Sequence, residues 1–185
     1  MNRKSYNLFF AILPDQEPAG RLEMLARRLC SAHKLTGHPF EADRFHISLQ
    51  NLGEYSCVPN EVVDAAGQAA ASVNAETFKV TFDRAGSFDT KSGRFPLVLL
   101  GDYGLIALRD FHRQLVSALK KEGLGRFVDF NYTPHITLLY ADRLIEDHPV
   151  EAISWQVKDF LLILSHIGES RYDFLGQWSL HDNAQ

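Results

Sequence analysis

Hydrophobic and polar residues along this chain follow two periods, one typical of strands and one typical of helices. An apolar run over residues 6–13 stops at Pro14, which predicts a buried first strand. Further strands are predicted where apolar residues alternate with polar ones, or where turn residues bound an apolar run. These segments are 44–53, 77–88, 95–103, 131–140, 153–168 and 172–180.

Three segments carry apolar residues three or four positions apart, as one face of a helix does. In the first, the spacing is kept by Leu22, Leu25, Leu29 and Cys30. The second covers residues 61–73, with Asn60 as its expected N-cap. In the third, the spacing is kept by Leu105, Leu108, Phe111, Leu115 and Leu119. The resulting order, β-α-β-α-β-β-α-β-β-β, predicts an α+β fold with a mostly antiparallel sheet.

One tetrapeptide shape, His–Ile–Ser/Thr–Leu, occurs on two of the predicted strands, as "HISL" from His46 and "HITL" from His135. Side chains alternate between the faces of a strand, so His46 shares a face with Ser48, and His135 shares one with Thr137. Each pair is held about 6.6 Å apart along a rigid element. Among eight histidines, two such matches arise by chance in about 1% of sequences of this composition.

Two histidines that face each other across a cleft can act as an acid–base pair. One takes a proton from an attacking water, and the other gives a proton to the leaving oxygen. The hydroxyls of Ser48 and Thr137 can donate hydrogen bonds to phosphate oxygens. This set of groups suits the cleavage of a strained cyclic phosphodiester and needs no metal.

Composition narrows the class of partner and compartment. The formal net charge is −4, so we expect no duplex DNA partner, which would need a basic face. Cys30 and Cys57 match no metal-ligand spacing and are expected to be reduced thiols of a cytoplasmic protein. The N-terminal apolar run is short and lacks a cleavage pattern, and no stretch reaches the roughly 20 apolar residues that span a membrane.

Other chemistry is less well supported by the residues. A zinc site built on His46 and His135 would lack a nearby cysteine or carboxylate to complete it. A nucleophilic Ser48 activated by His46 would lack an orienting third group. Phe130 and Tyr132 precede the second motif and could stack a nucleobase, although aromatic residues at such positions more often pack the strand.

The motifs and their surroundings resemble the 2H phosphoesterase superfamily, and within it the bacterial RNA 2′,3′-cyclic phosphodiesterase branch, also called 2′-5′ RNA ligase. "ADRFHISLQNLGE" and "YTPHITLLY" resemble the two motifs of that branch. "YNLFFAILP" and "LLILSHIGESRYDFLGQWSL" are similar to its opening and closing strands. The resemblance implies a single bilobal domain over residues 1–185. Two mostly antiparallel sheets with flanking helices would be related by an approximate two-fold axis, and each would bring one motif to a central cleft.

The resemblance also implies a function. It is the metal-independent opening of 2′,3′-cyclic phosphates, on RNA 3′ ends or small cyclic nucleotides, to 2′-phosphomonoesters, with 2′-5′ RNA ligation as a further activity. His46 would donate a proton to the leaving ribose oxygen, His135 would accept one from water, and Ser48 and Thr137 would hold the phosphate. The residues themselves do not distinguish donor from acceptor. We expect a monomer that needs no cofactor and binds no membrane.

Two alternatives stay open at this point. The chain could carry another activity of the superfamily, on an ADP-ribose-type cyclic phosphate or on 2′-5′ linkages. It could also be a non-catalytic module that binds nucleotide ends.

The sequence departs from the branch at one point. Many members carry arginine directly after the leucines of the second motif, where this chain has Tyr140. Strict alternation would point Tyr140 toward the Ile136 face, away from the phosphate, unless the strand ends or bulges there. Arg143, Arg44 and Arg171 are candidates to balance the phosphate charge, and the sequence does not choose among them. Tyr132, Tyr140 and Arg143 are thus further candidates for substrate binding.

Overall fold

A computed structural model describes residues 5–91, 93–129 and 131–182. Its strands are β1 (Tyr6–Ile12), β2 (Ile47–Tyr55), β3 (Phe78–Ser87), β4 (Phe95–Leu100), β5 (Ile136–Ala141), β6 (His148–Val157), β7 (Asp159–His166) and β8 (Arg171–Ser179). Its α-helices are α1 (Gln16–Ala32), α2 (Asn60–Ala71) and α3 (Ile106–Lys121). Three short 3₁₀ turns are η1 (Ala42–Arg44), η2 (Tyr103–Leu105) and η3 (Gly125–Phe127).

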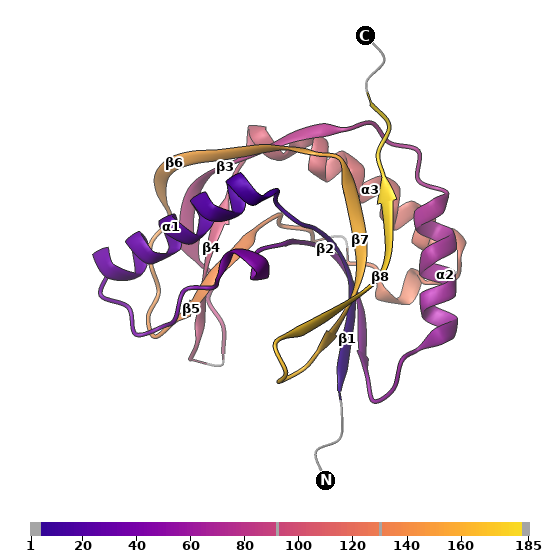
Figure 1. Cartoon of the computed structure of the whole chain (residues 1–185), viewed down its shortest axis with the longest axis horizontal. Coiled ribbons are helices and arrows are strands. Elements are labelled where there is room, and N and C mark those ends of the chain that lie inside the picture. Colours follow the sequence, from indigo (N-terminus) through magenta and orange to yellow (C-terminus); the bar gives the residue numbers. More distant parts are fainter. Residues whose placement is uncertain (1–4, 92, 130, 183–185) are drawn as a thin grey trace.

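The strands form one sheet in the order β6-β3-β4-β5-β2-β1-β7-β8, with every neighbouring pair antiparallel. In the strand order, its two four-stranded halves are joined at β2 and β5, through the residue pair Ile47 and Ile136. The predicted α+β fold with mostly antiparallel strands is therefore confirmed, and the two expected sheets are the two halves of this sheet. Figure 1 shows the halves curving toward each other as an arch.

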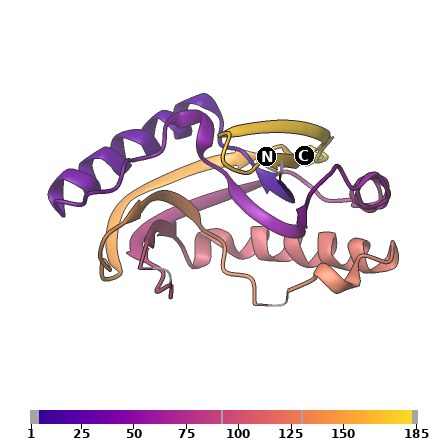
Figure 2. The same cartoon turned by 90° about the horizontal axis from the view of Figure 1, so that it is seen from below.

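Helices pack against strands of both halves of the sheet. Helix α1 packs against β5 and β6, α2 packs against β8 and α3, and α3 also packs against β3. Figure 2 shows α1 and α3 on opposite sides of the molecule. The apolar stripe of each helix faces a core whose largest fully buried side chains include Phe10, Phe45, Phe82, Phe111 and Phe160. Burying a side chain of this size stabilises the fold by about 1.5–3 kcal/mol.

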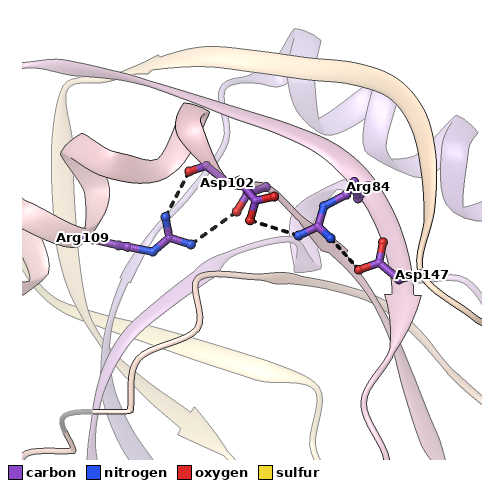
Figure 3. A network of polar contacts seen from close by, with 5 residues as sticks. Arg84, Asp102, Arg109 and Asp147 are labelled. Carbon is purple, nitrogen blue, oxygen red and sulfur yellow. Dashed lines mark hydrogen bonds and ion pairs between the residues drawn. The ribbon is translucent and has the colours of Figure 1, made fainter.

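A network of arginines and aspartates ties the outer strands of one half together (Figure 3). Arg84 on β3 bonds to Asp147, which precedes β6, at 2.7 Å and to Asp102, which follows β4, at 3.1 Å. Arg109 on α3 donates to the backbone carbonyls of Asp102 and Gly101. The network joins β3, α3 and two loops, and it occupies both guanidinium groups.

Several predicted boundaries are wrong. The strands predicted over 44–53 and 131–140 begin at Ile47 and Ile136, so each motif histidine lies just before its strand. The single strand expected over 153–168 is two strands, β6 and β7, which meet at Lys158. β6 pairs with β3 and β7 pairs with β1, so the chain crosses between the halves of the sheet at this point. The expected cap Asn60 is the first residue of α2, and Pro59 occupies the N-cap. No helix among the described residues combines the length and apolar character needed to cross a membrane.

Candidate active site

The two motif strands meet where Ile47 on β2 pairs with Ile136 on β5. Both isoleucines are fully buried, which anchors the junction in the core. His46 and His135 directly precede them, are only partly buried, and belong to the opposite face of the sheet. The antiparallel pairing thus brings together two histidines from distant parts of the sequence.

The positions of the motif hydroxyl groups follow from the same strand register. In an antiparallel pair, the residues on either side of Ile47 and Ile136 lie across from one another, which sets His46 opposite Thr137 and Ser48 opposite His135. Ser48 lines a pocket with each histidine. Thr137 is half-buried on the same strand face and lies outside both pockets.

Both imidazoles are held in the same orientation by the backbone two residues before them. The Nδ1 atom of His46 lies 3.0 Å from the carbonyl oxygen of Arg44. The Nδ1 atom of His135 lies 2.8 Å from the carbonyl oxygen of Thr133. A carbonyl oxygen only accepts hydrogen bonds, so Nδ1 carries the hydrogen in both rings. The Nε2 atom of each ring is left to exchange a proton with a substrate.

The two histidines line two pockets that share a border. The pocket at His135 has a volume of about 570 Å³ and is also lined by Ser48, Asn51, Phe88, Asp89, Asp129 and Tyr132. The pocket at His46 has a volume of about 290 Å³ and is also lined by Asn7, Phe9, Ser48, Asn51, Ser165 and Tyr172. Ser48 and Asn51 line both pockets, so the two form adjoining parts of one cleft.

Aromatic rings pack around each imidazole. The ring of His46 lies 5.3 Å from that of Phe9 and 6.0 Å from that of Tyr172. The ring of His135 meets that of Phe88 edge-on at 4.9 Å. Sequence reasoning did not find these three aromatics. All three lie in predicted strands, over residues 6–13, 77–88 and 172–180, but a strand prediction does not say which face adjoins the cleft.

The environment of His46 favours its neutral form. Burial is the main cause that lowers the pKa of His46, and the positive charges of Arg44 and of protonated His135 lower it further. The hydrogen bond to the carbonyl of Arg44 acts in the opposite direction. His46 is therefore mostly neutral at pH 7 when the cleft holds no anion.

Tyr132 lines the larger pocket, but one face of its ring is already in contact. That ring stacks on His112 at 3.8 Å, with 13° between the planes. Its hydroxyl is buried without a hydrogen-bond partner among the described residues, and burial raises its pKa. Tyr132 is thus a wall of the pocket, and a base could stack only on its other face. Phe130 lies outside the described residues.

Strict alternation does not hold at Tyr140, because β5 has the bulge that the sequence left open as an exception. Leu97 on β4 pairs with Leu139, whereas the next residue, Val98, pairs with Thr137, which leaves Leu138 as an extra residue. Both Leu138 and Leu139 join the core, so Tyr140 returns to the face of Thr137. Tyr140 is 43% exposed and lines neither pocket.

The remaining predicted binding residues do not join the histidines. Arg143 donates to the carbonyl of Lys34 at 3.3 Å, pairs with Asp142 at 3.6 Å and lines neither pocket. Arg171 lies beside His166 and pairs with Asp173 at 3.4 Å. Within the described ranges, no group of three histidine, cysteine, aspartate or glutamate side chains could hold a metal ion.

Comparison with known proteins identifies similar sequences and folds. A family described as the 2′-5′ RNA ligase superfamily matches residues 14–166. The structure of Escherichia coli LigT in apo form is 26% identical, with a TM-score of 0.72, and the match covers 96% of this chain and 99% of LigT. Protein TT0787 of Thermus thermophilus is 20% identical, with a TM-score of 0.72, and the match covers 96% of this chain and all (100%) of that protein. No curated protein matches the chain.

LigT has also been solved with small ligands. Its complex with 3′-AMP is 27% identical to this chain, with a TM-score of 0.68, and the match covers 95% of this chain and 98% of LigT. Further LigT structures contain phosphate, ATP or NADP+.

Proposed function

Because the chain belongs to the 2′-5′ RNA ligase superfamily, we propose that it hydrolyses 2′,3′-cyclic phosphodiesters to 2′-phosphomonoesters with His46 and His135 as an acid–base pair. The observation that supports this most strongly is the pairing of Ile47 with Ile136, which makes the two histidines diagonal neighbours across the junction of β2 and β5. The shared Nδ1–H orientation supports it further, since it leaves both Nε2 atoms available.

In the proposed reaction, water attacks the phosphorus opposite the 3′-oxygen of the ribose. Nε2 of His135 takes a proton from the water as its oxygen bonds to phosphorus. Nε2 of His46 gives a proton to the 3′-oxygen as its bond to phosphorus breaks, and the phosphate stays on the 2′-oxygen. Ser48 and Thr137 donate hydrogen bonds to the phosphate oxygens, where negative charge builds up. Exchange of protons with solvent then resets both rings.

Assigning the donor role to His46 requires that the substrate changes its protonation. Its pKa is lowered in the free protein, chiefly by burial, so the imidazolium form is scarce before binding. A phosphodiester carries a negative charge, and an anion beside an imidazole stabilises the protonated ring. We propose that substrate binding supplies this charge, so that His46 becomes a competent acid only in the complex.

The size and charge of the cleft favour a single nucleotide or an RNA end. A pocket of about 570 Å³ beside His135 is large enough for a nucleoside. Asp89 and Asp129 at its border would repel further phosphates along a nucleic-acid strand. E. coli LigT has been solved with 3′-AMP, and we extend this kind of ligand to the present chain as part of the proposal. If the 5′-hydroxyl of a second RNA end replaced water, the same proton transfers would form a 2′-5′ linkage.

The proposal is tested with a panel of nucleoside 2′,3′-cyclic phosphates and cyclic-ended oligonucleotides, assayed in the presence of EDTA. We expect turnover to 2′-phosphomonoesters, identified by the position of the phosphate in the product. Binding without turnover would favour a nucleotide-end binding module instead, and loss of turnover on adding EDTA would favour metal-dependent chemistry. Turnover restricted to ADP-ribose-type cyclic phosphates or 2′-5′ linkages would place the chain with other activities of the superfamily.

The cellular setting is proposed on separate grounds. Cys30 and Cys57 are free thiols, which suits the reducing cytoplasm. That the protein is a monomer stays a prediction.

A further inference from the structure

The cleft needs a positive charge that the second motif does not supply. A phosphodiester is already an anion, and attack by water adds further negative charge to its oxygens. Tyr140 stands after the motif leucines, lies on the face of Thr137 and carries no charge near neutral pH. An arginine from elsewhere in the fold would add a permanent positive charge to that of protonated His46.

Five other arginines have partners or contacts of their own. Arg143 and Arg171 have the carboxylate partners described above. Arg84 and Arg109 belong to the network of Figure 3. Arg94 lies over the ring of Tyr140, with its guanidinium carbon 5.4 Å from the ring centroid, and its side chain is exposed.

Arg44 differs from these residues in position and contacts. It ends η1, two residues before His46, and is only partly exposed. Its guanidinium carbon lies 4.3 Å from the centroid of the Tyr172 ring. Arg44 itself lines neither pocket, but Tyr172, which it contacts, lines the pocket of His46. In the part of the chain that the structure describes, no carboxylate forms an ion pair with Arg44.

The stack on Tyr172 suits an arginine that binds an anion. A cation over an aromatic face is held by the ring's negative potential, which leaves the N–H groups at the guanidinium edge available. Two of these N–H groups can donate to two phosphate oxygens at once, and such bidentate bonds are among the strongest that proteins make. Because burial raises the pKa of the Tyr172 hydroxyl, the ring stays uncharged across the working pH range.

We propose that Arg44, oriented by the ring of Tyr172, binds and neutralises the phosphate group in the cleft, in place of the arginine that is absent at Tyr140. This assignment rests on the proposed function, because it names the residue that holds the phosphate at that site. Tyr172 acts as a positioning residue, since its ring fixes the direction of the Arg44 guanidinium.

The first test compares arginine variants in turnover of a nucleoside 2′,3′-cyclic phosphate. We expect Arg44→Gln to lower kcat/KM about 100-fold, the typical loss when one transition-state donor is removed. Arg44→Lys should recover only part of this loss, because lysine restores the charge without the planar fork. Arg27→Gln, on an exposed arginine of α1 that pairs with Glu23, is the matched control and should stay within about twofold of wild type. A large loss in Arg143→Gln or Arg94→Gln, with Arg44→Gln near wild type, would assign the phosphate to a rival arginine.

A second pair of variants tests the role of the ring. Tyr172→Phe keeps an aromatic face under Arg44, whereas Tyr172→Leu removes it. We expect the phenylalanine variant to be at least about fivefold more active than the leucine variant. The difference should be mainly in kcat, because a misplaced Arg44 guanidinium weakens stabilisation of the transition state more than binding of the substrate. Equal activities would show that the stack does not orient Arg44.

Binding of inorganic phosphate, measured by calorimetry, keeps the two proposals separable. Wild type and Arg27→Gln should bind it, and Arg44→Gln should bind it at least about tenfold more weakly. If wild type turns over no cyclic phosphate yet loses phosphate affinity with Arg44→Gln, the proposed function fails and the role of Arg44 stands. If wild type is active and Arg44→Gln keeps both activity and affinity, the inference is overturned and the function stands. Thermal unfolding of each variant checks folding, and Arg44→Lys provides the same comparison if the glutamine variant unfolds.

Discussion

The reactivity of His46 and His135 depends on which ring nitrogen carries the hydrogen. In both rings Nδ1 is tied to the carbonyl oxygen two residues earlier, so the backbone sets the tautomer. The motif sequences predict that each histidine shares a strand face with a hydroxyl, because that follows from alternation alone. They do not predict the tautomer, because it depends on how the backbone turns before each strand.

Single substitutions of the two histidines test the proposed pair. We expect His46→Ala and His135→Ala each to lower kcat by at least about 100-fold, within the range that general acid–base catalysis supplies. The double variant should lose little more than the worse single variant, because one proton path is broken in each case. Steady-state turnover of a cyclic nucleotide measures this. A single variant with near wild-type kcat would contradict the two-histidine mechanism.

The titration of His46 gives a second prediction at this scale. Its pKa in the free protein should lie below the ordinary value of 6.5, mainly because of burial and then because of the charges of Arg44 and His135. Inorganic phosphate should raise it, since the anion stabilises the imidazolium. NMR titration of the His46 ring protons, assigned with His46→Gln, measures both values. An unchanged pKa with saturating phosphate would mean that the anion binds elsewhere.

The same shift has a consequence for stability. Because the folded state binds the His46 proton less readily than the unfolded chain, the stability contributed by neutral His46 is present above pH 6.5. It is lost as the pH falls from 6.5 through the lowered folded-state pKa.

Helices and strands are predictable from sequence where one face is buried and the other is exposed. The motif strands and the three helices follow from their periods, because each has one face toward the core and one away from it. The break at Lys158 does not, because no glycine or proline marks it and apolar residues continue on both sides, at Val157 and Phe160. The bulge at Leu138 also escapes a period-two pattern, and it changes the face on which Tyr140 lies.

A close contact between a loop and β5 gives a prediction at the scale of elements. A Cβ at Gly37 would lie 2.2 Å from the carbonyl oxygen of Tyr140, which is backbone and cannot move aside cheaply. We expect Gly37→Ala to lower the free energy of unfolding by about 1–3 kcal/mol, the usual cost of overpacking. Gly20→Ala is the matched control, because that helical position has no atom within 4 Å of the added Cβ. It should gain about 0.5–1 kcal/mol.

Urea unfolding of both variants measures these changes, with the slope checked for constancy. If Gly37→Ala were as stable as wild type, the loop at Gly37 would not lie against β5 as closely as the structure places it.

At the scale of the whole molecule, the site exists only because two half-sheets meet at one residue pair. A sequence with seven predicted strands does not specify that Ile47 pairs with Ile136, because the pairing depends on long-range packing of helices on both halves. The contact of Arg44 with Tyr172 has the same origin. It joins η1 to β8, and β8 belongs to this half of the sheet through its pairing with β7. The motifs therefore predict which side chains take part, and the topology determines how they are arranged in space.

The coupling between substrate charge and the protonation of His46 gives the last prediction. Both kcat/KM and kcat should depend on pH as a bell, because one histidine must be protonated and the other neutral. With His46 as the donor and His135 as the acceptor, the active form has a protonated His46 and a neutral His135. The lowered pKa of His46 makes this form scarce in the free enzyme, so the plateau of the bell in kcat/KM should be low.

In kcat, which reports the complex, the bound phosphodiester stabilises the imidazolium, so the alkaline limb should move to higher pH. Rates measured from pH 5 to pH 9 with a cyclic nucleotide, with single-turnover runs to show that chemistry limits, locate both limbs. An alkaline limb at the same pH in kcat and in kcat/KM would show that the bound phosphodiester does not raise the pKa of the pair. A flat profile would exclude the acid–base pair altogether.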